Sequence, residues 1–243
     1  MGPFINKAPP GSRITWDDPG PHMEWPPRAS YKTQVAQRLD PAREERLLAG
    51  AKHATQFFMG VADVQRALEK VARLLREDAI PYALIGAMAV NEYGYQRVTV
   101  DVDLLLSLEG LTRFKERHLG RGYVERFPGS KGLRDVENGV SIDIVLAGEY
   151  PGDGLPKPVR FPDPAEAALV GERLSVLPLP KLVELKLASG MTAPHRLKDL
   201  ADVLELIRAV HLAEDFGRQL DPYVQPKYLD LWRAAQSRDP EER

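Results

Sequence analysis

The sequence predicts an α/β fold in which a small mixed sheet with its helices precedes a mainly helical C-terminal lobe. Three observations support this fold class. Short apolar strand patterns alternate with helical patterns from Gly60 to Gly148. The segment "EYPGDGLPKP" then breaks this alternation with proline and glycine. Beyond it the hydrophobic spacing is mostly helical, with "ERLSVLPL" as one further strand.

The composition divides the chain into three parts. Residues 1–30 form a proline-rich arm, which we expect to be extended and irregular because proline fixes φ and removes a backbone donor. Residues 31–160 hold the α/β core with its leading helices, and residues 161–243 hold the helical lobe. The segment "GPHM" resembles a cloning scar, so Met23 is an alternative natural start.

The elements of the core follow in order from the hydrophobic spacing. A poorly periodic helical stretch covers residues 31–58, and Val64, Leu68 and Val71 mark a clear amphipathic helix that starts near Asp63. The segment "YALIG" predicts a strand, and "AMAVNEYGY" predicts a short helix. The later strands are "VTVDVDLLLS", "GYVERF", "LRDVEN" and "VSIDIVLAG", and the helices are "LTRFKERHLGR", "PKLVELKLASG", "HRLKDLADVLELIRAV" and "PYVQPKYLDLWRAAQ".

Composition and charge exclude several classes of protein. The chain has 243 residues, of which 43% are hydrophobic and 28% charged, which is typical of a globular protein. The absence of cysteine excludes disulfide frameworks and thiolate metal sites, and the five histidines lack metal-ligand spacing. No apolar run is long enough to cross a membrane and no secretory signal is visible, so we expect a cytoplasmic protein.

Two aspartates, Asp101 and Asp103, interrupt the apolar strand "VTVDVDLLLS". Residues i and i+2 of a strand point the same way, about 6.5–7 Å apart, so both carboxylates lie on one face. Two such carboxylates can converge on a pair of Mg²⁺ ions. Asp143 is a third acid inside another apolar strand. The alternative is an edge strand whose polar face is solvated.

A glycine turn precedes these acids. In "LIGAMA" a strand leads through Gly86 into the start of a helix, where bare N–H groups suit a phosphate. The spacing from Gly86 to Asp101 leaves room for one short helix between neighbouring strands. We therefore expect the turn and the acids to lie at one edge of the sheet.

The order of glycine turn, D-x-D and a later third carboxylate resembles the signature of the nucleotidyltransferase superfamily, whose fold is shared with DNA polymerase β. The form "R-x-T-x-D-x-D", with "KLVELKLASG" and "HRLKDLADV", narrows the resemblance to the AbiEii-type abortive-infection toxins. The resemblance covers roughly Val61 to Val210. It implies Mg²⁺-dependent transfer of a nucleoside monophosphate from a nucleoside triphosphate to an acceptor hydroxyl.

The resemblance also implies roles for residues. Asp101, Asp103 and Asp143 would bind the metal, and Asp143 would help to deprotonate the attacking hydroxyl. Ala87 stands where the family usually has Gly or Ser, which removes a hydroxyl contact with the phosphates. The residues assigned to the nucleotide are Gly86, Ala87, Arg97, Thr99, Lys186, Arg196 and Asp199.

Each assignment to the nucleotide has a structural alternative. Thr99 can simply suit a strand, and Lys186 can lie along apolar surface with its amine in water. Arg196, Asp199 and Asp202 can form a solvated helix face.

A basic segment offers a surface for the acceptor. From Leu111 to Arg134 there are seven Lys or Arg residues against Glu116 and Glu125, an excess of +5 in a chain of net charge −2. Such an excess can bind an RNA backbone, or it can solvate a helix and a hairpin. We expect a toxin that modifies RNA, such as the acceptor end of tRNA, beside a cognate antitoxin. The alternatives are a small-molecule nucleotidyltransferase of the antibiotic-modifying kind, a protein-modifying AMP transferase and a decayed binding module.

Overall fold

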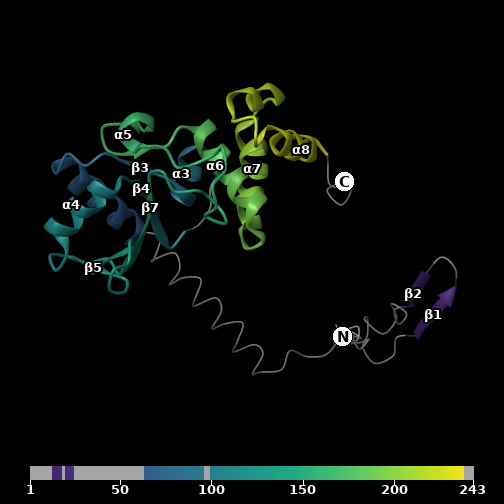
Figure 1. Ribbon diagram of the computed structural model, residues 1–243, viewed down its shortest axis with the longest axis horizontal. Helices are drawn as coiled ribbons and strands as arrows, with labels where there is room; N and C mark the ends of the chain where they lie inside the picture. The colour runs from purple at the N-terminus through teal and green to yellow at the C-terminus, as the bar shows by residue number, and fades with distance from the viewer. Residues whose placement is uncertain (1–12, 18–19, 25–62, 96–98, 238–243) are drawn as a thin grey trace, which may run out of the picture. The chain divides into compact units, whose positions relative to one another are not determined.

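A computed structural model of the chain describes residues 13–17, 20–24, 63–95 and 99–237 (Figure 1). The chain forms two compact units, Met1–Thr55 and Gln56–Arg243. The described part of the first unit is an antiparallel hairpin of β1 (Arg13–Asp17) and β2 (Gly20–Glu24), which the prediction of an irregular arm does not include. The helical stretch predicted over residues 31–58 lies outside the described residues. The three-part division predicted from composition stays a prediction.

The second unit is built on a seven-stranded mixed sheet in the order β5-β6-β7-β4-β3-β9-β8, which confirms the predicted α/β class. At its centre, β4 (Asp101–Leu106) pairs in parallel with β7 (Val140–Leu146) and antiparallel with β3 (Tyr82–Leu84). The outer strands are β5 (Tyr123–Glu125), β6 (Leu133–Asp135), β8 (Leu169–Val170) and β9 (Ser175–Val176).

One face of this sheet is covered by a helix over residues 63–77 and by α4 (Leu108–His118). The helix over 63–77 reaches the sheet through Lys70, which donates a hydrogen bond to Asp135 of β6. Phe114 of α4 packs edge-on against Tyr123 of β5, with 5.1 Å between ring centroids. The apolar residues at helical spacing in both helices are buried here, so this face holds the main core.

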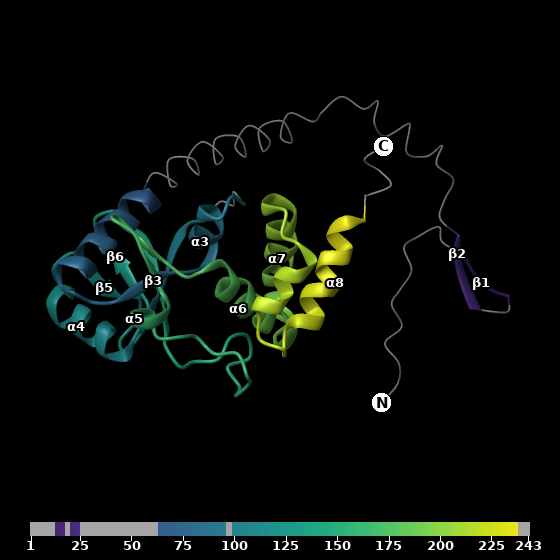
Figure 2. The same ribbon diagram turned by 90° about the horizontal axis from the view of Figure 1, so that it is seen from above.

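The remaining helices are one short helix between β3 and β4 in the chain and those that follow β7 and β9. α3 (Gly86–Glu92) joins β3 to β4, and α5 (Pro164–Ala167) follows β7. In Figure 2, α6 (Leu179–Thr192) lies between the sheet and α7 (Leu197–Val210), and α7 lies between α6 and α8 (Gln225–Gln236). Two short 3₁₀ turns, η1 (Pro194–Arg196) and η2 (Glu214–Gln219), flank α7. None of the helices in the described residues could span a membrane.

Helix α6 is buried on all sides over residues 182–190. The sequence predicts that this helix ends at Gly190, but it continues to Thr192. A side chain at position 190 would overlap Leu200 of α7, so glycine is needed for the close approach of the two helices.

Candidate functional site

The three predicted acids lie on the face of the sheet opposite to the main core. In the parallel pairing of β4 with β7, Asp103 stands directly beside Asp143, and Asp101 stands beside Ser141. Neighbouring residues at one register position point to the same side of a sheet, so all three acids share a face. Val102 and its apolar neighbours alternate with them and are buried on the core side. The structure therefore places the acids on one face of the sheet, as the alternation of residues along the two strands predicts.

These acids line a cavity of about 360 Å³ that also reaches α3 and the C-terminal lobe. Lys198, which the sequence analysis did not select, contributes to its wall. It is exposed, and no described residue forms an ion pair with it. Its place two residues after Arg196 in "HRLKD" is the only sequence signal for it, and it is a weak one. The lining is Gly86, Ala87, Thr99, Val100, Asp101, Asp103, Asp143, Lys186, Arg196, Lys198 and Asp199, and Arg97 lies outside the described residues.

The glycine turn contacts Asp103 directly. Gly86 has φ +65°, a conformation that L side chains rarely adopt, and a Cβ at this position would overlap the Asp103 carboxylate. The backbone N–H of Ala87 acts on the same carboxylate and lowers its pKa. The family resemblance assigns this N–H to a phosphate, and that role stays a prediction. The requirement for glycine therefore arises first from the close approach of the turn to the acid.

Asp103 carries a negative charge that its surroundings do not compensate. Burial raises the pKa of its carboxyl to about 6, and the nearby charges of Asp101 and Asp143 contribute to the shift. The charge of Lys186 and the Ala87 N–H act in the opposite direction. A bound cation would relieve this repulsion, and carboxylate oxygens are the ligands that Mg²⁺ prefers. The residues around Asp103 therefore fit a magnesium ion.

The two outer acids already have partners. The hydroxyl of Thr99 donates to the Asp101 carboxylate, and the guanidinium of Arg126 pairs with Asp143. In the described residues, no three acid, histidine or cysteine side chains are gathered closely enough to hold a metal ion. We therefore expect a metal to be held by one or two of these carboxylates together with substrate phosphates, as is usual for Mg²⁺.

A buried ionic cluster joins α6 to α7 beside the acids. The Lys186 amine, in a residue 7% exposed, donates to Asp202 at 2.7 Å and to Asp199 at 3.2 Å. Asp199 also accepts a hydrogen bond from Ser189 at 2.7 Å and pairs with Arg196 at 3.2 Å. Asp199 and Asp202 therefore do not belong to a solvated helix face, and the Lys186 amine does not lie in water; both structural alternatives predicted from the sequence are wrong for these residues.

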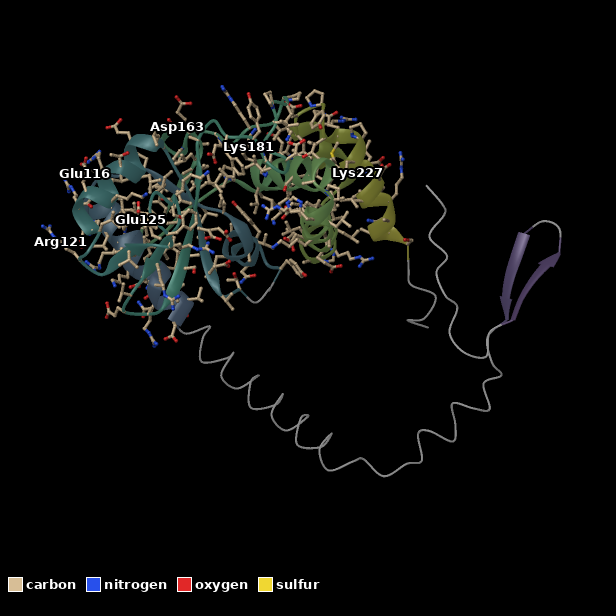
Figure 3. The ribbon with its side chains drawn as sticks, turned by 60° about the horizontal axis from the view of Figure 1, so that its bottom comes forward. Glu116, Arg121, Glu125, Asp163, Lys181 and Lys227 are labelled. Carbon is tan, nitrogen blue, oxygen red and sulfur yellow. The ribbon has the colours of Figure 1, made fainter. Side chains whose placement is uncertain are left out.

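The predicted basic segment is largely neutralised within the fold. Arg117 pairs with Asp78, and Lys131 pairs with Glu149 at 2.6 Å, so acids distant in sequence compensate the local excess. Figure 3 shows Arg121 pointing outward at the end of the second unit that carries Glu116 and Glu125. Two further cations of the segment are paired, Lys115 with Glu125 and Arg126 with Asp143.

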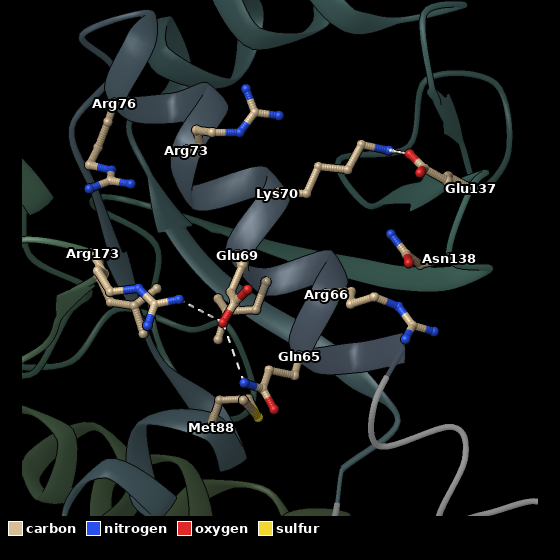
Figure 4. Close-up of a pocket in the computed structure, with 12 residues that line it drawn as sticks. Gln65, Arg66, Glu69, Lys70, Arg73, Arg76, Met88, Glu137, Asn138 and Arg173 are labelled. Carbon is tan, nitrogen blue, oxygen red and sulfur yellow. Dashed lines mark hydrogen bonds and ion pairs between the residues drawn. The ribbon is translucent and has the colours of Figure 1, made fainter.

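A larger cavity of about 730 Å³ lies beside the helix over residues 63–77 (Figure 4). It is rich in arginine, but its cations already have partners: Lys70 pairs with Glu137 at 2.8 Å, and Arg173 pairs with Glu69 at 2.9 Å. It contains no carboxylate whose charge is left uncompensated in the way that the charge of Asp103 is. The cavity around Asp103 is therefore the better candidate for a catalytic site, although it is smaller.

Comparisons with known proteins show little similarity in sequence. No protein-family model matches the chain, and no curated protein matches it. Among solved structures, ANT(2″)-Ia in complex with adenylyl-2″-tobramycin aligns with 12% identity and a TM-score of 0.41. The alignment covers 72% of this chain and 99% of that one. The function proposed below therefore rests on the residues of this chain.

Proposed function

We propose that this protein is a Mg²⁺-dependent nucleotidyltransferase that moves a nucleoside monophosphate from a nucleoside triphosphate to an acceptor hydroxyl. The observation that carries the proposal is the half-buried Asp103, which lies near the charges of Asp101 and Asp143 and against the Gly86 turn. Lys186 and Lys198 line the same cavity and can receive phosphate oxygens. Such a site suits a polyphosphate bound with a metal ion.

In the proposed reaction the acceptor oxygen attacks the α-phosphorus while the bond from this phosphorus to the bridging oxygen of the β-phosphate breaks. Pyrophosphate leaves with that oxygen, and the proton of the acceptor hydroxyl passes to the carboxylate of Asp143. Magnesium, when bound by Asp101 and Asp103, supplies charge neutralisation for the phosphates. Arg126 orients Asp143 through their ion pair, which must loosen for the carboxylate to take the proton. The chain contributes mainly by positioning the reactants.

We propose RNA as the first acceptor to test, because of the resemblance to the toxin branch. Arg113, Arg121 and Arg134 of the basic segment form no ion pair with a described residue, so they remain available for phosphate contacts. A cognate antitoxin and a cytoplasmic location stay predictions that follow from the same resemblance and from the sequence.

A small hydroxylated molecule is the second candidate acceptor. The observation that favours it is the pairing of the other four cations of the basic segment with acids of the same chain. These pairs leave less uncompensated charge for a long phosphate backbone than the sequence suggests.

Label transfer tests the proposal and separates the two acceptors. Wild type and Asp103→Asn are incubated with each α-³²P-labelled nucleoside triphosphate and Mg²⁺, with either total RNA or a panel of small aminoglycosides and other polyols. We expect label in one acceptor class for wild type only. Equal labelling by both proteins, or no nucleotide-dependent labelling by wild type in any mixture, would contradict the proposed chemistry.

A further inference from the structure

A second, more apolar cavity of about 90 Å³ adjoins the cavity around Asp103. Gly86, Asp103 and Lys186 line both cavities, together with Arg196 and Asp199, so the two share part of their wall. The first cavity holds the other acids and Lys198, and we call it the polar end. The second, which we call the apolar end, is completed by Ile85, Val145, Pro151, Phe161, Leu182, Leu185 and Ser189.

The wall of the apolar end is a loop that follows β7, and its two ends are paired to each other. The N–H of Gly148 donates to the carbonyl of Phe161 at 2.8 Å, and the N–H of Phe161 donates to the carbonyl of Glu149 at 2.9 Å. The proline- and glycine-rich segment that separates the core from the lobe thus begins and ends at neighbouring positions in space. This pairing fixes the backbone of Phe161, whose side chain lines the cavity.

The same loop is fixed to the C-terminal end of α6. The amine of Lys157, whose side chain is 6% exposed, donates to the carbonyl of Pro151 at 2.6 Å. It also reaches the hydroxyl of Thr192 at 3.4 Å. A Cβ at Gly152 would overlap Thr192 and lie 2.8 Å from the carbonyl of Ser189, so the backbone here packs directly on the helix. The wall is therefore formed before any ligand binds.

We propose that the apolar end binds the nucleobase of the nucleoside triphosphate, with Phe161 as the surface on which the base stacks. This inference rests on the proposed function. Pro151, Leu182 and Leu185 are buried, whereas Phe161 is partly exposed and can offer its ring to a ligand. Every nucleobase has an apolar face that stacks on aromatic side chains. The apolar end therefore matches the one uncharged, planar part of the substrate.

The positions of the charged groups support this orientation. The α-phosphorus must lie near Asp101 and Asp103, and the nucleoside and the pyrophosphate leave it in different directions. Lys198 lines only the polar end, so the negative β- and γ-phosphates belong there. Asp143 also lines only the polar end, so the acceptor hydroxyl approaches from that side. The nucleoside is then left with the apolar end.

Binding of two ligands to three variants tests this inference. The ligands are a non-hydrolysable α,β-methylene nucleoside triphosphate and inorganic tripolyphosphate, each titrated calorimetrically with Mg²⁺. For Phe161→Ala we expect the nucleotide to bind about 5- to 100-fold more weakly, which corresponds to the loss of one stacked base. Tripolyphosphate should bind as it does to wild type, because it has no base.

Two further variants make the result specific. Phe161→Leu keeps apolar volume and loses the aromatic face, so it should still weaken nucleotide binding several-fold even if the alanine variant folds poorly. Phe216→Ala is the matched control, because Phe216 is also half-buried but packs against Tyr228 in the lobe, with 5.6 Å between centroids. It should change neither affinity.

The outcomes distinguish this inference from the proposed function. Unchanged nucleotide affinity in both Phe161 variants would overturn the base site while leaving the transferase proposal in place. An equal loss of affinity for tripolyphosphate and nucleotide would overturn it too, because the effect would then not concern the base. If wild type binds neither ligand, the proposed function itself fails, and the base site fails with it.

Discussion

Two aspartates of the same sheet, the fully buried Asp135 on β6 and the half-buried Asp103 on β4, show opposite solutions to the removal of a carboxylate from water. Asp135 is 0% exposed and accepts hydrogen bonds from Lys70 at 2.8 Å, from Asn138 at 2.6 Å and from the Glu137 N–H at 3.1 Å. Burial alone would raise the pKa of Asp135, but Lys70 and Asn138 hold it below its ordinary value. Asp135 is therefore a fully satisfied, structural acid.

Asp103 differs in the charges that surround it. Its nearest charged neighbours on the sheet are two further acids, and its pKa is raised rather than lowered. A buried charge without compensation destabilises a protein, and such groups are found where function requires them. The difference teaches that burial alone does not identify a catalytic acid. The balance of charge around each acid makes Asp103, and not Asp135, the candidate for a catalytic role.

The largest expected effect is the loss of catalysis in Asp103→Asn. Removal of one metal carboxylate should lower the rate of nucleotide transfer by at least about 10³-fold, that is by about 4 kcal/mol in transition-state stabilisation. Treatment of wild type with a chelator should give the same loss, and added Mg²⁺ should reverse it. Circular dichroism should show a folded variant. Transfer at the wild-type rate would remove Asp103 from the reaction.

Substitution of Asp135, on the core face of the sheet, should lower stability and leave catalysis unaffected. Asp135→Ala leaves the half-buried Lys70 without its main partner, so we expect the free energy of unfolding to fall by about 3 kcal/mol. Below its melting temperature the variant should bind nucleotide with the wild-type affinity. Chemical denaturation with parallel nucleotide titration checks both statements. A loss of nucleotide affinity without a loss of stability would show that the two faces do not have separate roles.

The pH dependence of stability should have opposite sign at the two acids. In metal-free protein the folded pKa of Asp103 is about 6, above its unfolded value, so its ionisation destabilises the fold as the pH rises through this range. At pH 7 and without metal, Asp103→Asn should be about 1–3 kcal/mol more stable than wild type. This gain should disappear towards pH 4.

Asp135 should give the opposite dependence of stability on pH. Its folded pKa is lowered, so its stabilising contribution is present above its unfolded pKa and is lost as the pH falls through the folded one. Denaturation curves of wild type and both variants between pH 3 and 8, with a chelator present, measure the two signs. If both acids changed stability with pH in the same direction, the contrast drawn between Asp103 and Asp135 would be wrong.

Gly86→Ala should weaken both stability and catalysis by moderate amounts. The left-handed φ of +65° costs a residue with a Cβ about 1–2 kcal/mol, and the added methyl group must also displace the Asp103 carboxylate. Gly94→Ala is the matched control, because Gly94 also has a positive φ of 99° but has open space around its Cβ position. The Gly94→Ala variant should be less stable than wild type but transfer nucleotide at the wild-type rate. Equal rates for the two variants would show that contact with Asp103 is unimportant.

The smallest effect concerns the basic segment. Charge reversal of Arg121 and Arg134, which form no ion pair with a described residue, should change stability by less than about 0.5 kcal/mol each. If RNA is the acceptor, the variant should bind it more weakly and with a shallower dependence on salt, while nucleotide binding is unchanged. Unchanged RNA labelling at physiological salt would favour the small-molecule acceptor.

The sequence by itself determined much of the core of the fold. Alternation and helical spacing are local properties, so the strands around Asp101 and Asp143 and the amphipathic helix before Pro81 could be predicted from neighbouring residues. The shared face of Asp101 and Asp103 follows from the period of two along a strand. The need for glycine at position 86 was also visible, although not its reason.

Only the tertiary structure decided which groups meet. The register of β4 against β7 places Asp103 beside Asp143, forty residues along the chain, and no local pattern encodes that pairing. The same holds for Lys186, which lies between Asp199 and Asp202 of another helix, and for Phe161, which a loop brings back to the cavity. Periodicity determines the direction in which a side chain points, whereas the packing of distant elements determines which charges surround it and therefore whether a buried acid stabilises the fold or can bind a metal.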